Sequence, residues 1–303
     1  MRIGVTGSSG LIGRSLVEAL AARGDQVVRF VRPRTTAPDG AIVRWEPTTR
    51  DVDESDLRRA GPLDAIVNLA GTGIGDRRWT AARRQAILSS RLAATDLVVE
   101  IIERLPGGLS ALVSASAVGY YGSHPTTIVD ETSPAGTDFL ATVCSQWEDA
   151  ASRARRFGTR VALVRTGIVL SAAGGALARQ LPLFRRGLGG PLASGRQWVS
   201  PISLVDEVRA IQWILDSDQV GPHNLVAPTA TTNAEMTATV ARALGRRAAV
   251  RVPAIALDVA LGRGLSREAI LASQNAQPRR LLEEGFGFQH PDVNAIVAAA
   301  LAS

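Results

Sequence analysis

Apolar residues in the N-terminal half of the chain alternate between short continuous runs and stripes with a spacing of four. Residues 2–6 form the first run, and Ile12, Leu16 and Leu20 then mark one face of a helix that ends near Gly24. Further strands are expected at 26–31, 41–45, 63–69, 111–114 and 160–165, and helices at 81–104 and 138–157. This alternation predicts an α/β fold built on a doubly wound parallel Rossmann sheet with right-handed crossovers.

The pattern becomes less regular after Gly167, where glycine-rich loops separate shorter apolar stretches. Helices are expected there at 176–184, 204–215, 232–244 and 294–301, and short strands at 223–226 and 250–253. We therefore expect a Rossmann domain over residues 1–170, with 198–226 returning to it, and a smaller C-terminal α/β substrate lobe over 171–197 and 227–303.

All of the basic side chains in this chain of 303 residues are arginines, and they give it a net charge of +6. Pairs such as Arg83-Arg84 and Arg185-Arg186 are scattered among acids rather than gathered in one block. Most of them are expected on solvated helix faces, so we predict no nucleic-acid partner. One or two would suffice to bind a phosphate-bearing ligand.

Several other functional classes are excluded by what the sequence lacks. Cys144 is the only cysteine, so neither an internal disulfide nor a cysteine-built metal centre can form. His124, His223 and His290 have no metal-ligand spacing, and we predict no metal site. No apolar run reaches about 18 residues, and the chain begins in a strand pattern rather than a signal peptide. We expect a cytoplasmic protein without a membrane partner.

Three glycines, Gly7, Gly10 and Gly13, lie between the first strand and the first helix. Glycine lets a pyrophosphate approach the backbone, and the helix N-terminus supplies unpaired N–H groups and a positive dipole end. The position between strand and helix therefore predicts a dinucleotide site, although the spacing differs from the common G-x-G-x-x-G. The alternative is a tight turn without a ligand.

The second strand ends in Val31-Arg32, where NAD-binding proteins usually carry an acid for the ribose 2′-hydroxyl. A guanidinium at this position would bind a 2′-phosphate through two hydrogen bonds, and an acid would repel it. We therefore predict NADP(H) as the cofactor. Alternatively, Arg32 is a solvated loop charge that stacks on adenine, which would leave the preference open.

Several further segments resemble one protein family. They are Asn68-Leu69-Ala70-Gly71, Ser90-Arg91, Gly119-Tyr120-Tyr121-Gly122, Trp147-Glu148, Arg165-Thr166-Gly167 and Gly187-Leu188-Gly189-Gly190-Pro191. With the glycine loop, they make the whole chain similar to the extended, sugar-nucleotide-epimerase-like branch of the short-chain dehydrogenase/reductases, especially its atypical NADP-dependent subgroup. The expected cofactor contacts are Gly7, Ser9, Gly10, Leu11, Ile12, Gly13, Val31, Arg32, Leu69, Ala70, Gly71, Arg91 and Val169.

The acid–base pair of that superfamily, Tyr-x-x-x-Lys, is missing from this chain, because it contains no lysine. In the family, lysine lowers the pKa of the tyrosine so that the phenol can exchange a proton near neutrality. The resemblance aligns the two positions with Phe139 and Val143. Ser116 matches the family's serine, which polarises the substrate oxygen, although a serine at a strand end can also simply bond the backbone.

Two other side chains are candidates for moving the proton. Tyr121 could point into the cleft, but a role in packing or in stacking on substrate fits an unassisted phenol better. Glu148 could act as a general acid or base if its helix turns it inward, whereas solvent-facing glutamates are commoner. Ser116, Tyr121 and Glu148 are therefore the candidate catalytic residues, with water as a further proton carrier.

Three other features have both a functional and a structural interpretation. Cys144 is expected as a small buried side chain rather than a nucleophile, and Asp206 as the cap of the following helix rather than a substrate contact. The loop at 187–198, with Arg185, Arg186 and Arg196 nearby, is either a lid that clamps an anionic substrate or a rigid connector.

The leading hypothesis is an NADP(H)-dependent oxidoreductase or epimerase that acts on a small carbonyl or hydroxyl substrate. Anionic compounds are among the candidate substrates. The missing Tyr–Lys pair beside an intact cofactor loop leaves an alternative, which is a non-catalytic NADP(H)-binding regulator or scaffold. The sequence leaves the substrate and the oligomeric state open.

Overall fold

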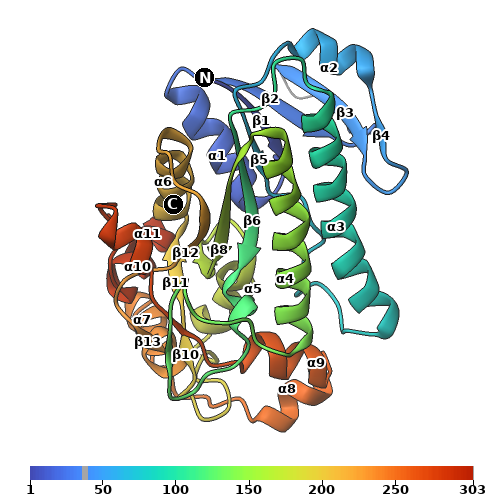
Figure 1. Ribbon diagram of the computed structural model, residues 1–303. Helices are drawn as coiled ribbons and strands as arrows, with labels where there is room; N and C mark the ends of the chain where they lie inside the picture. The colour runs from blue at the N-terminus through green and yellow to red at the C-terminus, as the bar shows by residue number, and fades with distance from the viewer. Residues whose placement is uncertain (36–39, 303) are drawn as a thin grey trace.

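A single large sheet forms the centre of the molecule (Figure 1). The computed structural model describes residues 1–35 and 40–302. Eight strands are ordered β12-β8-β6-β5-β1-β2-β3-β4, and all neighbours are parallel except β3 and β4. The Rossmann-type fold class expected from the sequence is confirmed. The strands are β1 (Arg2–Thr6), β2 (Gln26–Val31), β3 (Ala41–Glu46), β4 (Asp51–Val52), β5 (Ala65–Asn68), β6 (Ala111–Ala117), β8 (Arg160–Thr166) and β12 (Gly221–Leu225).

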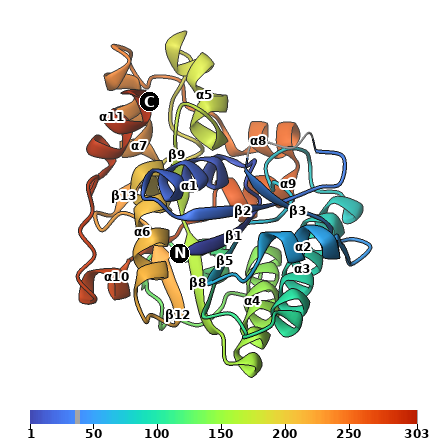
Figure 2. The same cartoon turned by 90° about the horizontal axis from the view of Figure 1, so that it is seen from above.

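Helices cover both faces of this sheet, as seen from above in Figure 2. One face is packed by α1 (Leu11–Ala22) and α6 (Leu204–Asp216). The other is packed by α2 (Glu54–Ala60), α3 (Ala81–Arg104) and α4 (Phe139–Ser152), which ends in the 3₁₀ turn η2 (Arg153–Phe157). Because both faces are covered, the strands are apolar at consecutive positions, which explains the continuous runs in the sequence.

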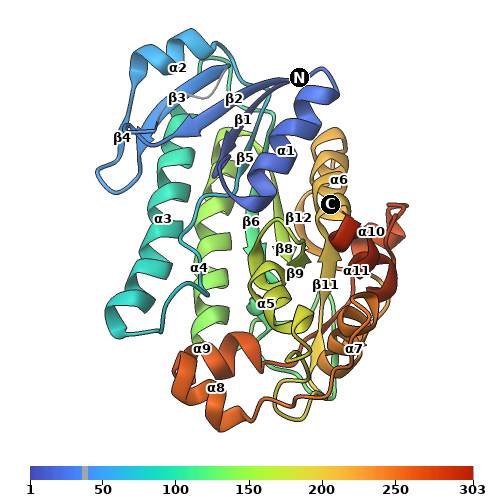
Figure 3. The same ribbon diagram turned by 180° about the vertical axis from the view of Figure 1, so that it is seen from behind.

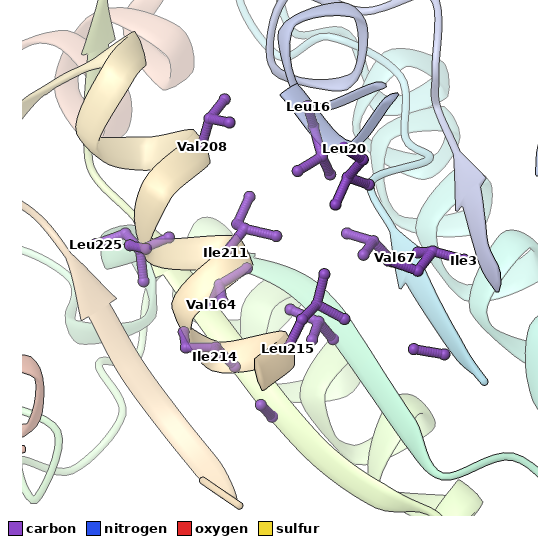
Figure 4. Close-up of a cluster of buried hydrophobic side chains, with 14 of the residues drawn as sticks. Ile3, Leu16, Leu20, Val67, Val164, Val208, Ile211, Ile214, Leu215 and Leu225 are labelled. Carbon is purple, nitrogen blue, oxygen red and sulfur yellow. The ribbon is translucent and has the colours of Figure 1, made fainter. Parts of the chain in front are cut away.

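The core on the α1 and α6 side joins elements from distant parts of the sequence (Figure 4). Ile3, Leu16 and Leu20 come from β1 and α1, and Val67 and Val164 from β5 and β8. The spacing of four in α1 therefore faces the sheet as expected. Each fully buried Leu or Ile stabilises the fold by about 1.5–3 kcal/mol relative to an exposed position. From α6 and β12 come Val208, Ile211, Ile214, Leu215 and Leu225.

A second group of elements lies at the carboxyl ends of the strands (Figure 3). Its core is formed by α5 (Gly175–Arg185), α7 (Asn233–Ala243) and α11 (Val293–Ala302). Three pairs of short strands connect it to the rest: β9 (Ile168–Leu170) with β11 (Pro201–Ser203), β10 (Trp198–Val199) with β13 (Thr231–Thr232), and β7 (Ile128–Val129) with β14 (Asn275–Ala276). The remaining elements are η1 (Val118–Tyr121), α8 (Ala254–Leu261), α9 (Arg263–Leu265), a π-helical turn at Ser266–Ile270 and α10 (Arg279–Glu283).

Two expectations about this region need correction. Residues 250–253 form no strand, because only a single bridge pairs Val252 with Leu192. Asp206 does not cap α6: Ser203 is the cap, and its Oγ accepts a hydrogen bond from Asp206 N at 3.0 Å. The Asp206 carboxylate instead accepts hydrogen bonds from the backbone N–H groups of Gln289 and His290, which ties the C-terminal segment to α6.

The domain limits stay a prediction, although β12 does join the large sheet beside β8, as expected for residues that return to the first domain. None of the described helices combines the length and the apolarity needed to span a bilayer.

Candidate cofactor site and catalytic cluster

The glycine loop leaves the start of α1 bare. Gly7 has a φ of +65°, and a Cβ on it would lie 2.7 Å from the carbonyl oxygen of Leu69. A Cβ on Gly13 would collide with the carbonyl oxygen of Gly7. These two glycines are therefore required by the packing of the chain itself. Gly10 differs, since its added Cβ would meet only Gly7 O, at 3.3 Å, and no side chain caps the helix there.

A pocket of about 330 Å³ lies in front of this loop. It is bounded on one side by the glycine loop and Leu69, and on the other by Ile168 and Val169 of β9 with Gly175 and Ala176 of α5. The structure thus brings the expected Gly7, Gly10, Leu11, Ile12, Gly13, Leu69 and Val169 together around one cavity. Unpaired N–H groups at the start of a helix, with no Cβ in front of them, fit the pyrophosphate of a dinucleotide.

The start of α5 was not expected at this pocket. Gly175 has a φ of +71°, and an added Cβ on Gly174 would come within 3.2 Å of the Leu11 side chain. These glycines therefore let α5 approach the start of α1. The Gly174-Gly175 pair was visible in the sequence, but its pattern indicated only a loop.

Arg32 follows β2 and is about half exposed, with 53% of its side-chain surface accessible. It forms an ion pair with Glu46 at the end of β3. A hydrogen bond from the Thr48 hydroxyl and the pairing with Arg32 lower the pKa of Glu46. A 2′-phosphate at this position would compete with Glu46 for the guanidinium. Of the other expected contacts, Ser9 is exposed and Val31 is buried at the end of β2.

Leu69 and Ala70 are held in place by the strand ends around them. Thr6 Oγ1 donates a hydrogen bond to Asn68 Oδ1 at 2.7 Å and accepts one each from Leu69 N and Ala70 N. Asn68 Nδ2 in turn donates to Thr95 Oγ1 at 3.0 Å. Asn68 thus ties β1, β5 and α3 together, which is the structural role that the sequence left open.

Arg91 of α3 supports the loop that follows β5. Its Nη1 donates to the carbonyl oxygens of Thr72 and Ile87 at 2.9 and 3.1 Å, and its guanidinium carbon lies 5.0 Å from the centre of the Trp147 ring. Burial lowers the pKa of Arg91. Gly71 packs directly on this arginine, because an added Cβ would lie 3.2 Å from Arg91 Cγ.

A buried polar cluster lies where the family's serine is expected. Ser116 of β6 donates a hydrogen bond to Glu148 Oε1 at 2.6 Å. Arg165 of β8 binds the same carboxylate with two hydrogen bonds, from Nε to Oε1 at 2.8 Å and from Nη2 to Oε2 at 2.9 Å. Ser116 and Arg165 are register partners in neighbouring strands, and α4 carries Glu148 over them. All three side chains are buried.

Tyr121 completes this cluster. Its hydroxyl donates to Asn224 Oδ1 at 2.7 Å and accepts from Arg165 Nη1 at 3.0 Å. Burial raises the pKa of Tyr121, so the phenol stays neutral at physiological pH. Although burial alone would lower the pKa of Arg165, its hydrogen bonds to Glu148 and its contacts with Tyr121 raise it. The geometry therefore supports the packing role for Tyr121 rather than that of a proton carrier.

The arrangement fixes the direction of the hydrogen bonds around Ser116. Glu148 is an acceptor paired with a guanidinium that stays charged. The Ser116 hydroxyl therefore donates its only hydrogen bond to the carboxylate. Only the lone pairs of Ser116 Oγ remain for another partner. Arg165, which sequence reasoning missed, thus orients Glu148, and Glu148 orients Ser116. Two signals were available, namely a charged residue at the end of the apolar run of β8 and the Arg165-Thr166-Gly167 segment of the family resemblance, but neither indicated this role.

The positions of the missing Tyr–Lys pair carry no acid–base group. Phe139 begins α4 and packs edge-on against Trp79, with ring centres 5.4 Å apart, and Val143 is buried. Burial raises the pKa of Cys144 to about 12, so its thiol stays protonated. No three potential metal-ligating side chains come together within 1–35 and 40–302.

The loop at 187–198 is closely packed at its glycines. Added Cβ atoms on Gly189 and Gly190 would collide with the Phe184 ring and with the backbone of Val250. This packing favours the rigid connector of the two alternatives, while Arg185, Arg186 and Arg196 remain exposed beside it.

Comparison with known proteins gives the same picture over the whole chain. The model of the NAD dependent epimerase/dehydratase family matches residues 3–227, and a domain of unknown function, DUF1731, matches residues 252–300. The epimerase family protein Mb2239 of Mycobacterium bovis is 42% identical over 98% of this chain and 97% of its own length.

Two solved structures are similar in fold and sequence. Human epimerase family protein SDR39U1 (isoform 2), crystallised with NADPH, superimposes with a TM-score of 0.87 at 34% identity, and the match covers both chains completely. A nucleoside-diphosphate sugar epimerase of Corynebacterium glutamicum has a TM-score of 0.78 at 33% identity, over 99% of this chain and 58% of that one. The family resemblance expected from the sequence is confirmed, and the NADPH of the human protein is the cofactor predicted here.

Proposed function

This chain belongs to the NAD dependent epimerase/dehydratase family, and from that premise we propose that it binds NADP(H) and uses it in an oxidoreductase or epimerase reaction on a small carbonyl or hydroxyl compound. The observation that carries this proposal is the pocket at Gly7, Gly10 and Gly13, where a helix N-terminus is left without a side-chain cap. The NADPH of human SDR39U1 supports the same cofactor.

The residues at the pocket would bind different parts of the cofactor. The N–H groups at the start of α1 would hold the pyrophosphate, because the dipole of the helix favours an anion there. Arg32 would release its ion pair with Glu46 and bind the 2′-phosphate of the adenosine ribose instead. Leu69 and Val169 bound the cavity further along, and Val169 is the proposed neighbour of the nicotinamide.

Bound nicotinamide would supply the hydride transfer, which leaves the protein to orient substrate and to manage one proton. Ser116 Oγ would accept a hydrogen bond from a substrate hydroxyl, because its own O–H already donates to Glu148. When such a hydroxyl is oxidised, its proton would pass to Ser116 Oγ while the Ser116 proton passes to Glu148 Oε1. Arg165 would keep the carboxylate in place for this relay. Tyr121 has no part in it.

The test is NADPH oxidation, measured over a panel of small aldehydes, ketones and sugar-nucleotide ketones. Turnover in the wild type that falls at least about a hundredfold in Ser116→Ala is expected from the loss of an orienting hydroxyl and its proton path. Tyr121→Phe serves as the control, since it removes a buried hydroxyl of the same cluster without breaking the relay. Turnover that falls equally in both variants would show that the cluster only supports the fold.

A second candidate function is that of a non-catalytic NADP(H)-binding regulator or scaffold. It is favoured by the positions of the missing pair, where Phe139 and Val143 offer no exchangeable proton, and by the pairing of Glu148 with Arg165, which occupies both carboxylate oxygens. Tight NADPH binding without turnover on any member of the panel would favour this function over the enzyme.

A further inference from the structure

Exposed apolar side chains are concentrated on two segments at one end of the molecule. Ten large apolar residues are exposed among those the structure describes, and half of these lie within 183–188 and 250–259. Ile255 and Val259 of α8 are the most exposed of all, at 74% and 67%. They are four residues apart and therefore project from the same side of the helix. Only Leu257 of α8 is buried.

The two segments lie side by side. Ala193 N donates to Val252 O at 2.8 Å, and Val252 N donates to Pro191 O at 3.0 Å. Arg246 Nε also donates to the carbonyl oxygen of Arg185 at 3.0 Å. Figures 1 and 3 place α8, which follows directly, at the lower extremity of the molecule.

The charge around these apolar side chains is mostly positive. No acid occurs between residues 150 and 205, and Asp258 is the only acid between Glu235 and Glu268. Asp258 is paired with Arg267. Five exposed arginines here form no ion pair with an acid in the described part of the chain, although Arg263 lies close enough to Asp258 to help Arg267 lower its pKa. They are Arg185, Arg186, Arg247, Arg251 and Arg263. These arginines with Leu188, Val250, Ile255 and Val259 are called the α8 face below.

Arginines that are distant in the sequence thus lie on two segments joined by hydrogen bonds, and α8 with its exposed Ile255 and Val259 follows the second of these directly. A folded protein partner would need a groove that matches these exposed side chains, and the exposed apolar residues include none of the tryptophans or tyrosines typical of binding hot spots. A fluid bilayer accepts protruding aliphatic side chains of any shape, and anionic headgroups complement arginines. Nucleic acid would satisfy the arginines but would leave the aliphatic side chains in water.

We propose that the α8 face docks this protein on the surface of an anionic lipid bilayer, with Ile255 and Val259 inserted among the headgroups. This departs from the expectation that the chain has no membrane partner, which rested on the absence of a spanning segment and of a signal peptide. The proposal concerns peripheral attachment, and it is independent of the proposed reaction.

The test is co-sedimentation of the full-length protein with vesicles. Binding is expected to vesicles of phosphatidylcholine mixed with phosphatidylglycerol, to fall as salt is raised, and to be absent with phosphatidylcholine alone. The double variant Ile255→Asp/Val259→Asp should bind at least about tenfold more weakly. Arg251→Gln and Arg263→Gln should each weaken binding by about fivefold.

The matched control is Val220→Asp/Leu282→Asp, which introduces the same charges at apolar positions that are 49% and 47% exposed beside α10. This variant should bind vesicles like the wild type. Failure to bind anionic vesicles at low salt would overturn the proposal, as would equal loss in both double variants. A dimer in solution that the α8 variant alone abolishes would also overturn it, by identifying the face as an interface between copies.

Discussion

The two ends of the candidate site are built on opposite principles. At the glycine loop, no side chain caps the start of α1, and a pocket lies in front of it. At the buried polar cluster, Ser116, Glu148, Arg165 and Tyr121 bind one another, and every one of them is buried. The first end has room for a ligand, whereas the side chains of the second end satisfy one another's hydrogen bonds. The two ends are therefore expected to respond differently to substitution.

The largest expected effect comes from breaking the buried polar cluster. Glu148→Leu would leave Arg165 buried without its carboxylate, and a buried ion pair that loses one partner costs about 3–5 kcal/mol of unfolding free energy. The double variant Glu148→Leu/Arg165→Met should recover most of this loss, because no charge is left buried. Urea unfolding measures both. A double variant no more stable than Glu148→Leu would contradict the pairing as the source of the effect.

The glycine loop is expected to respond through binding rather than through stability. Gly10→Ala meets only one backbone oxygen at 3.3 Å, so the fold should hold, while the methyl group obstructs the pyrophosphate and weakens NADPH binding by about tenfold or more. Gly13→Ala should lose both stability and binding, because its Cβ collides with Gly7 O.

Calorimetric titration with NADPH and thermal unfolding separate the two glycine variants. Gly287→Ala is the control, since nothing lies within 4 Å of its added Cβ. Equal destabilisation by Gly10→Ala and Gly13→Ala would mean that Gly10 serves the chain rather than a ligand.

A smaller effect concerns Glu207, a buried acid on the opposite face of β8. Glu207 Oε1 accepts a hydrogen bond from Thr166 Oγ1 at 2.7 Å, and Oε2 has no partner in the described structure. Burial raises the pKa of Glu207 to about 8. Because the folded state keeps this proton up to that pH and the unfolded state releases it near 4.5, the carboxyl should lower stability as pH rises between these values.

Glu207→Gln carries no titrating proton, so its unfolding free energy should depend less on pH between about 4.5 and 8 than that of the wild type. Thermal unfolding at a series of pH values checks this. Identical pH dependence in the two proteins would show that Glu207 is charged in the folded state. A buried carboxylate would then be tolerated here without an arginine to pair with it.

The sequence predicted the glycine loop better than it predicted the buried polar cluster. The glycine loop, β1, α1 and the arginine after β2 are consecutive in sequence, so local spacing alone predicted them. The cluster joins Ser116, Glu148 and Arg165 from three elements, and only the register of β6 with β8 brings them together. Spacing within one element could not predict that contact. The helix α8 was missed for another reason, since it is short and has only one buried residue, which leaves no amphipathic stripe to detect.

The central claim is that a bare helix N-terminus and Arg32 together select NADP(H). Calorimetric titration of NADPH and NADH into the wild type and into Arg32→Glu tests it most directly, with Arg155→Glu as a control for the change of charge. The wild type and the control should bind NADPH more tightly than NADH, by about tenfold to a hundredfold for two charge-assisted hydrogen bonds, and Arg32→Glu should erase or invert this order. A wild type that binds NADH as tightly as NADPH, or an Arg32→Glu variant that keeps the preference, would contradict the account.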